Sequence, residues 1–187
     1  WGFDVENPYA GMGTAYRAVT GSGKPAFALL AEYDALPQIG HACGHNIIAA
    51  SAVGAGLALR PLLSELAGSI RVIGTPAEEG GGGKAIMVDE GIFEDVDAAM
   101  MIHPSNRNML GRGALTAYGL SVEFYGKAAH AAAAPDVGIN ALDAVLLTFN
   151  GINALRQHVR DDVRIHGIIT HGEEARRSRC AFFDRRR

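Results

Sequence analysis

The stretch PAFALLAEYDALPQIGHACGHNIIAASAVGAGLAL, residues 25–59, decides the fold. Residues 25–31 are a short apolar run that leads into the loop-forming residues 32–37, the pattern of a buried strand that ends in a loop. Residues 47–59 are rich in Ala, Leu and Ile and predict a helix that is buried on most of its faces. Between these elements, residues 40–46 carry side chains that are able to bind metals. The stretch therefore predicts a strand, a polar loop and a helix in succession.

A similar order of strand and polar segment follows twice more along the chain. Residues 69–74 predict a second strand that leads into the polar segment 75–79, and residues 97–102 predict a third strand that ends just before His103. Strands that alternate with helices favour an α/β fold with a mainly parallel sheet and helices on both faces. In such sheets binding sites lie outside the carboxyl ends of the strands. We therefore expect residues 1–112 to form one domain with all three polar segments at one edge.

The sequence changes character after this domain. Residues 115–125 predict a strand, residues 138–158 an amphipathic helix and residues 163–170 another strand. This β-α-β block predicts a second domain at 113–171 that the chain leaves unfinished, with strand edges unpaired.

The composition is that of a globular protein. Of the 187 residues, 48% are hydrophobic and 20% are charged, which excludes a chain that is disordered throughout. No apolar run reaches the roughly 18 to 20 uncharged residues that a membrane-spanning helix needs, and no secretion signal is recognisable. Cys43 and Cys180 show no disulfide pattern. We therefore expect a soluble, cytoplasmic protein without a membrane partner.

The last segment, residues 172–187, is unusually basic. Six of the 17 Lys and Arg residues lie in the last 13 positions, whereas residues 1–174 carry 11 basic and 19 acidic groups, a net charge of about −8. An arginine-rich tail is able to bind nucleic acid through its phosphates, but a frame shift in a GC-rich gene or a truncation gives the same composition. We favour a frame shift or truncation and expect no nucleic-acid partner.

Cys43 and His45 are candidate metal ligands. Zinc accepts thiolate, imidazole and carboxylate ligands, and hydrolytic zinc sites keep one position open for water. Two residues apart in a turn before a helix, the two side chains are able to converge on one metal cluster. An isolated segment of this kind is more often a buried cysteine beside a core histidine, and the neighbouring His41 is interpreted as structural.

Two further segments supply the context that favours a metal site. Glu78 and Glu79 follow the second strand, and adjacent carboxylates repel each other unless a cation or a shared proton lies close to them. His103 follows the third strand. Each feature alone is typical of ordinary surface or structural residues. Their joint occurrence after three successive strands is much less easily explained by chance.

The segments around these residues resemble a known enzyme family. YDALP at 33–37, GHACGHN at 40–46, TPAEEG at 75–80 and GKAAHA at 126–131 are similar to segments of the zinc amidohydrolases of metallopeptidase family twenty. The similarity runs over residues 3–171 and is greatest to the branch that holds hippurate hydrolase, aminobenzoyl-glutamate hydrolase and the aminoacyl dipeptidases.

The resemblance implies a domain plan and a metal centre. The first domain resembles a phosphorylase/hydrolase-like catalytic domain, and the second resembles the start of an inserted ferredoxin-like α+β dimerisation (lid) domain. Two divalent metal ions are implied, with zinc favoured and manganese or cobalt as alternatives. The implied ligands are Cys43, which bridges the two ions, and His45, Glu79 and His103.

The resemblance also implies catalytic roles. Glu78 acts as the general base on the attacking water and passes the proton to the leaving amine. Asp34 orients a ligand imidazole. His130 reaches the site of the partner subunit, where it polarises the scissile carbonyl and stabilises the oxyanion. The implied substrates are N-acyl amino acids, aminobenzoyl-glutamate-type conjugates or dipeptides, and the intact protein is expected to be a homodimer.

The chain departs from the family in its length. Family members are longer and carry a further ligand histidine downstream, so we expect this chain to be a fragment with impaired activity. Two other functions stay open: a non-catalytic zinc-binding or interaction module, and a cysteine hydrolase that uses Cys43 with His45. The second is disfavoured because residues two apart rarely present thiolate and imidazole in line.

Overall fold

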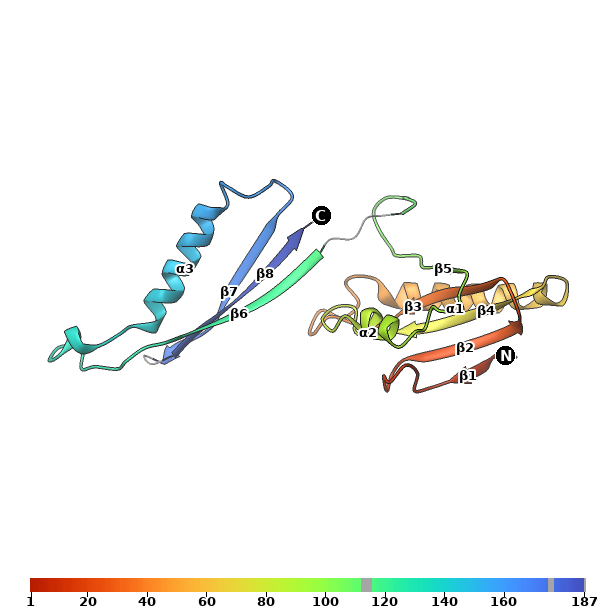
Figure 1. The fold of residues 1–187 in the computed structure, drawn as a ribbon, viewed down its shortest axis with the longest axis horizontal. Helices are drawn as coiled ribbons and strands as arrows, with labels where there is room; N and C mark the ends of the chain where they lie inside the picture. The colour runs from red at the N-terminus through yellow and green to blue at the C-terminus, as the bar shows by residue number, and fades with distance from the viewer. Residues whose placement is uncertain (112–115, 175–176, 187) are drawn as a thin grey trace. The chain divides into compact units, whose positions relative to one another are not determined.

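A computed structural model of the chain describes residues 1–111, 116–174 and 177–186, with side chains up to residue 172. The chain divides into two compact units, Trp1–Asn108 and Met109–Arg187 (Figure 1). Each unit is described by itself below.

The first unit contains a mixed five-stranded sheet in the order β1-β2-β4-β3-β5. Its strands are β1 (Asp4–Glu6), β2 (Tyr16–Ser22), β3 (Ala26–Glu32), β4 (Gly68–Thr75) and β5 (Ala98–Met100). Strand β3 runs parallel to β4 and β5, whereas β2 runs antiparallel to β1 and β4. The expectation of a mainly parallel sheet is therefore wrong. Parallel neighbours need a long crossover, which the helix-containing segment 33–67 supplies, whereas the short segment 7–15 returns the chain antiparallel.

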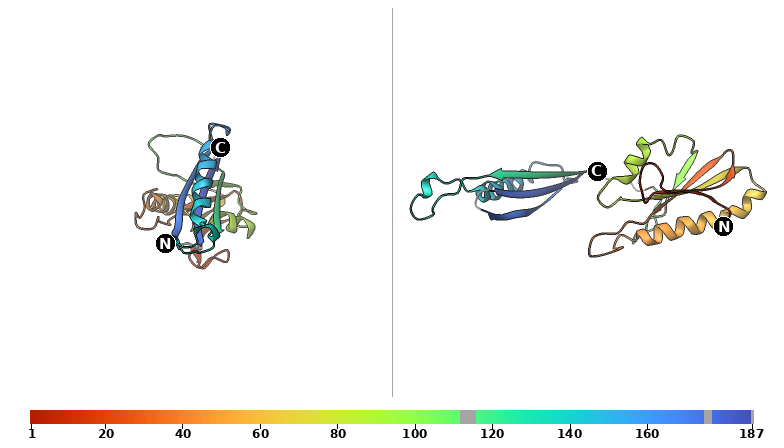
Figure 2. Two further views of the ribbon diagram at one scale, coloured as in Figure 1. Left: turned by 90° about the vertical axis from the view of Figure 1, so that its left-hand side faces the viewer. Right: turned by 90° about the horizontal axis from the view of Figure 1, so that it is seen from below.

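Helices cover both faces of this sheet, as expected. They are α1 (His45–Leu59), which continues into the 3₁₀ helix η1 (Arg60–Ser64), and α2 (Gly83–Asp89). Ala52 of α1 packs in one cluster with Leu29, and Met87 of α2 packs in another with Ala28. Because neighbouring residues of a strand point to opposite faces, the two helices lie on opposite sides of the sheet (Figure 2).

The second unit is a three-stranded antiparallel sheet covered by one long helix. Its elements are β6 (Thr116–Tyr125), the 3₁₀ turn η2 (Pro135–Val137), α3 (Ala141–Leu155), β7 (Arg164–Glu174) and β8 (Arg177–Arg186). The strand order is β6-β8-β7, so the last strand lies between the other two. Val145 of α3 is fully buried and packs against Val122 and Phe124 of β6.

The basic segment 172–187 differs from the expected atypical tail. Strand β7 continues to Glu174, and β8 forms the middle strand, paired with β6 and β7 along most of its length. The sequence contains a reason for this strand, because residues 180–183 are the apolar run CAFF. The high charge of the flanking arginines favoured a tail over a strand in the sequence analysis. The origin of the arginine-rich composition stays a prediction.

Helix α1 and η1 also bear on the question of membrane insertion. Among the residues that the structure describes, one helical stretch, His45–Ser64, is long and apolar enough to cross a membrane by length and composition, although the sequence analysis expected none. A helix that packs on a core sheet passes the same test. Helix α1 buries His45, Ile48, Ala52 and Gly56.

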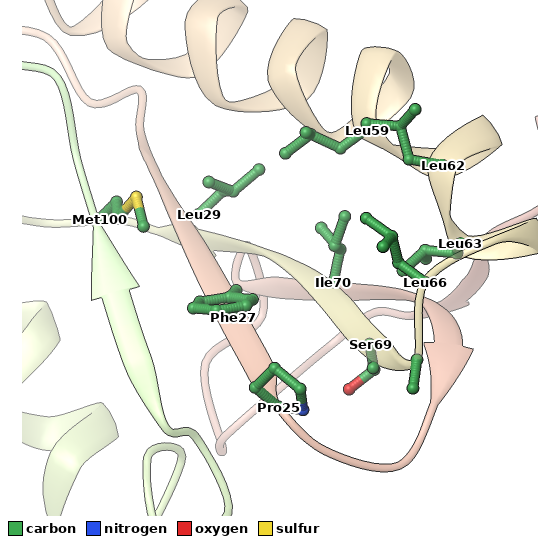
Figure 3. Close-up of a pocket in the computed structure, with 12 residues that line it drawn as sticks. Pro25, Phe27, Leu29, Leu59, Leu62, Leu63, Leu66, Ser69, Ile70 and Met100 are labelled. Carbon is green, nitrogen blue, oxygen red and sulfur yellow. The ribbon is translucent and has the colours of Figure 1, made fainter.

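An apolar groove of about 260 Å³ lies between the end of α1, η1 and the sheet (Figure 3). Phe27 and Leu29 of β3 form its floor, and Leu59 and Leu62 form its helical side. It lies toward the start of β3 and β4, away from the carboxyl ends of the strands, where the polar residues gather.

Candidate functional site

The candidate site lies at the carboxyl ends of the parallel strands β4, β3 and β5. Glu32 is the last residue of β3, the segment with Glu78 and Glu79 follows β4, and His103 follows β5. His45 is the first residue of α1, which follows β3. The structure thus brings the polar segments to one edge of the sheet, as the α/β pattern predicted.

His45 lies at the centre of the site and is 1% exposed. Its Nδ1 lies 3.1 Å from both Oδ1 and the backbone oxygen of Asp34. Both of these atoms only accept hydrogen bonds, so Nδ1 carries a proton and Nε2 is the nitrogen that is able to offer a lone pair. Nε2 faces three carboxylates, at 3.4 Å from Glu32 Oε2 and at 3.8 Å from Glu78 Oε2 and Glu79 Oε1.

Gly44 allows His45 to enter the site at the start of the helix. It is the N-cap of α1 and has a φ of 78°, in the left-handed region that favours glycine. A Cβ atom there would also lie 2.9 Å from Cγ of Pro104, the residue after His103. The glycine therefore permits both the turn and the close approach of the β5 segment.

Asp34 links two of the polar segments. Its Oδ1 accepts from His45 Nδ1, and its Oδ2 accepts from the backbone N–H of Glu79 at 2.8 Å. Burial raises the pKa of Asp34, but the hydrogen bonds from Glu79 and His45 outweigh it and hold the pKa below its ordinary value. The carboxylate is thus ionised and bonds to the imidazole, and its role in orienting a metal ligand stays a prediction.

Glu32 is a site residue that the sequence analysis missed. Its side chain is 2% exposed and forms an ion pair with Lys84 through Oε1. Across the described part of the chain, no hydrogen-bond partner reaches Oε2. A glutamate that closes an otherwise apolar buried strand was the available signal, because a buried carboxylate needs a partner.

Glu78 and Glu79 lie beside His45, and Cys43 lies beside Glu79 but belongs to neither group of ligand atoms that the described residues form. A hydrogen bond with Glu79, then burial and the nearby negative charges of Glu79, Glu78 and Asp34, raise the pKa of the Cys43 thiol. The thiol is therefore protonated until a cation offsets these charges, and metal binding would release its proton. The Glu78 side chain is 47% exposed and that of Glu79 is 18% exposed, so Glu78 is the carboxylate that is more accessible to solvent.

His103 completes the cluster beside His45. The two rings lie edge to face, with centroids 5.8 Å apart. His103 Nδ1 lies 2.8 Å from the backbone oxygen of Pro104, which can only accept, so Nε2 carries the lone pair. The described residues form two groups of possible ligand atoms, and within each group all the atoms lie within 4.8 Å of one another. The first group is Glu32, His45 and His103, and the second is His45, Glu78 and Glu79.

His130 belongs to the second unit. It is exposed, and its Nδ1 accepts from the backbone N–H groups of Ala132 and Ala133 at 3.3 and 3.1 Å. These bonds hold the ring in a local turn and leave Nε2 available. Its role at the site of a partner subunit stays a prediction.

Comparison with known proteins places the chain in a family. Residues 28–156, which contain the whole polar cluster, match Peptidase family M20/M25/M40. The chain belongs to this family. It is 44% identical over 176 residues to the Xaa-Arg dipeptidase of Mus musculus and 40% identical over 190 residues to a p-aminobenzoyl-glutamate hydrolase of Escherichia coli (strain K12). These alignments cover 88% and 91% of the chain but only 41% and 40% of the two relatives.

Solved structures share the family fold. A proposed aminohydrolase from methicillin-resistant Staphylococcus aureus matches with a TM-score of 0.74 at 21% identity, over 98% of this chain and 55% of that one. A Bacillus subtilis protein described as a dinuclear metal-binding peptidase of family M20 matches with a TM-score of 0.63 at 20% identity, over 98% of this chain and 54% of that one. The chain thus spans about half the length of these structures.

The Asp34 hydrogen bonds lead to a first prediction. Asp34→Asn keeps one acceptor oxygen but turns an N–H₂ group toward either the imidazole N–H or the Glu79 N–H, so one of the two bonds is lost. We expect zinc affinity to fall about 10- to 100-fold, the usual effect of losing a residue that orients a ligand. Competition titration with a chromophoric chelator measures this. An unchanged affinity would show that Asp34 does not orient His45.

Proposed function

We propose that the protein that carries this chain is a metal-dependent hydrolase of an amide bond in a dipeptide, an N-acyl amino acid or an aminobenzoyl-glutamate-type conjugate. The observation that carries the proposal is the meeting of His45 Nε2 with the carboxylates of Glu78 and Glu79, beside His103 and Cys43. The named relatives support the substrate classes, since they are a dipeptidase and an aminobenzoyl-glutamate hydrolase.

The donor set fits divalent metal ions. One thiol, two imidazoles and several carboxylates gather at one edge of the sheet, with the cationic side chain of Lys84 at one of the carboxylates. Cys43, His45, Glu79 and His103 would hold two ions, with zinc favoured by the sulfur and nitrogen ligands, and manganese or cobalt as alternatives. When bound, such ions polarise a carbonyl oxygen and acidify water.

The residues of the chain supply the remaining chemistry. Glu78, the more exposed of the two adjacent glutamates, takes a proton from the attacking water on its carboxylate and returns it to the amine that leaves. Glu79 stays fixed because its backbone N–H donates to Asp34. Asp34 in turn holds the proton on Nδ1 of His45 and so keeps Nε2 free to bind.

The second unit supports a role as a dimerisation (lid) domain. Its elements β6, α3, β7 and β8 in the strand order β6-β8-β7 match the first four elements of the ferredoxin-like β-α-β-β-α-β pattern, and the first unit would be the phosphorylase/hydrolase-like catalytic domain. In a homodimer, His130 would reach the site of the partner subunit and stabilise the oxyanion. A cytoplasmic location is part of the same proposal.

The proposal is tested by metal content and turnover together. Zinc, manganese and cobalt binding are measured on the chain itself, and hydrolysis of a dipeptide, an N-acyl amino acid and p-aminobenzoyl-glutamate is measured on the protein that carries it. We expect two bound ions, and turnover of at least one substrate class that a chelator stops and added metal restores. Turnover that survives chelation would favour a cysteine hydrolase, and metal binding without turnover would favour a structural zinc module.

A further inference from the structure

Glu32 has a partner for only half of its carboxylate. It is the last residue of β3 and lies on the same face as Ala28 and Leu30, toward α2, because alternate residues of a strand share a face. Lys84 of α2 therefore pairs with Oε1. The other oxygen, Oε2, has no hydrogen-bond donor among residues 1–111, 116–174 and 177–186.

An unpartnered oxygen at this position is costly. The Glu32 side chain is 2% exposed, and a buried carboxylate oxygen without a partner loses its hydration without compensation. The nearest polar atom in the site is Nε2 of His45, at 3.4 Å. Because Nδ1 of His45 donates to Asp34, Nε2 is the ring nitrogen that faces Oε2, and no hydrogen bond joins these two atoms.

A cation between the two atoms would supply the missing partner, since it accepts lone pairs from both. His103, whose ring lies beside that of His45, is able to supply a third lone pair. Its Nδ1 bonds to the backbone oxygen of Pro104, so Nε2 is the nitrogen left for a cation. The ligand atoms of Glu32, His45 and His103 lie within 4.8 Å of one another. Two imidazoles and one carboxylate are a set that divalent zinc accepts.

We propose that Glu32 is a metal ligand that joins His45 and His103 around one ion of the site, and that Lys84 holds its carboxylate and balances its charge. This proposal rests on the proposed function, because it requires that the site bind divalent ions. It assigns to one ion the set of Glu32, His45 and His103, and leaves Glu79 and the Cys43 thiol to the neighbouring position.

The test measures metal binding rather than activity. Zinc is titrated against a chromophoric chelator into the chain, into Glu32→Gln and into Lys84→Met, with Glu65→Gln as the control because Glu65 is an exposed glutamate after η1. We expect Glu32→Gln to weaken one of the two zinc equivalents at least 100-fold, more than the loss of a residue that only orients a ligand, and Lys84→Met to weaken it about 10-fold. Glu65→Gln should bind like the unmodified chain.

Cobalt gives an independent readout of ligand number. The visible spectrum of the cobalt-loaded chain should change in Glu32→Gln, because one oxygen ligand is lost, and stay unchanged in Glu65→Gln. Melting of the metal-free proteins should show that Glu32→Gln is folded and close to the unmodified chain in stability, because the lost ion pair with Lys84 is offset by removal of the charge at the buried Oε2. Should Glu32→Gln fail to fold by circular dichroism, Lys84→Met and Glu32→Asp carry the same comparison.

The outcomes separate this inference from the proposed function. Two tight zinc equivalents with an unchanged cobalt spectrum in Glu32→Gln would overturn the role of Glu32 and leave the hydrolase proposal standing. A chain that is folded but binds no divalent ion would overturn both.

Discussion

Glu78→Gln should abolish most of the turnover of the protein that carries this chain, by about 10²- to 10⁴-fold in kcat, while the metal content stays the same. Gln has nearly the shape of Glu but cannot take up and return a proton. Glu78 is the half-exposed member of the pair, and its Oε2 lies 3.8 Å from His45 Nε2, at the edge of the cluster that solvent reaches. The loss should therefore fall on kcat, with little effect on metal binding.

The measurement combines steady-state kinetics with metal analysis of the purified variant. Glu90→Gln is the matched control, because Glu90 is an exposed glutamate at the end of α2. Its substitution makes the same chemical change outside the cluster. Loss of bound metal in Glu78→Gln would show that Glu78 is a ligand instead of the base. Full turnover with metal present would contradict the proposed mechanism.

His45→Ala should remove metal binding and turnover together. His45 belongs to both groups of ligand atoms, so its loss removes the ligand at the centre of the cluster. We expect zinc affinity to fall by more than about 100-fold, since a ligand contributes more than a residue that orients it. The metal-free protein should also be less stable by about 1–3 kcal/mol, because Oδ1 of Asp34 loses its donor.

Chelator competition and thermal melting of the metal-free protein measure the two effects. His41→Ala is the control, since His41 is an exposed histidine in the same loop. If His45→Ala still bound two zinc ions tightly, the metal-site assignment would be wrong. A similar loss of zinc affinity in His45→Ala and His41→Ala would indicate damage to the loop.

Most residues of the candidate site could be predicted from the sequence, because they follow strands that are recognisable from short apolar runs. The apolar run of β3, the helix α1 and the positions of His45, Glu78 and His103 after successive elements predicted that they would meet at one edge. Glu32 escaped this reasoning. Its proposed role depends on two contacts, burial beside His45 and the ion pair with Lys84, which lies in α2 about 50 residues later in the chain. Neither contact is visible in a local sequence pattern.

The sequence by itself determined strands β3 and β4, helix α1 and the side chains that are able to bind metal, because periodicity and side-chain chemistry are local properties, but it did not predict strands β1, β2 and β8. Only the tertiary structure decided the order and direction of the strands. The antiparallel β1 and β2, and the insertion of β8 between β6 and β7, depend on hydrogen bonds between residues far apart in the chain. The same long-range packing buried Glu32 against His45, and so added a carboxylate to the metal-binding cluster that the sequence had outlined.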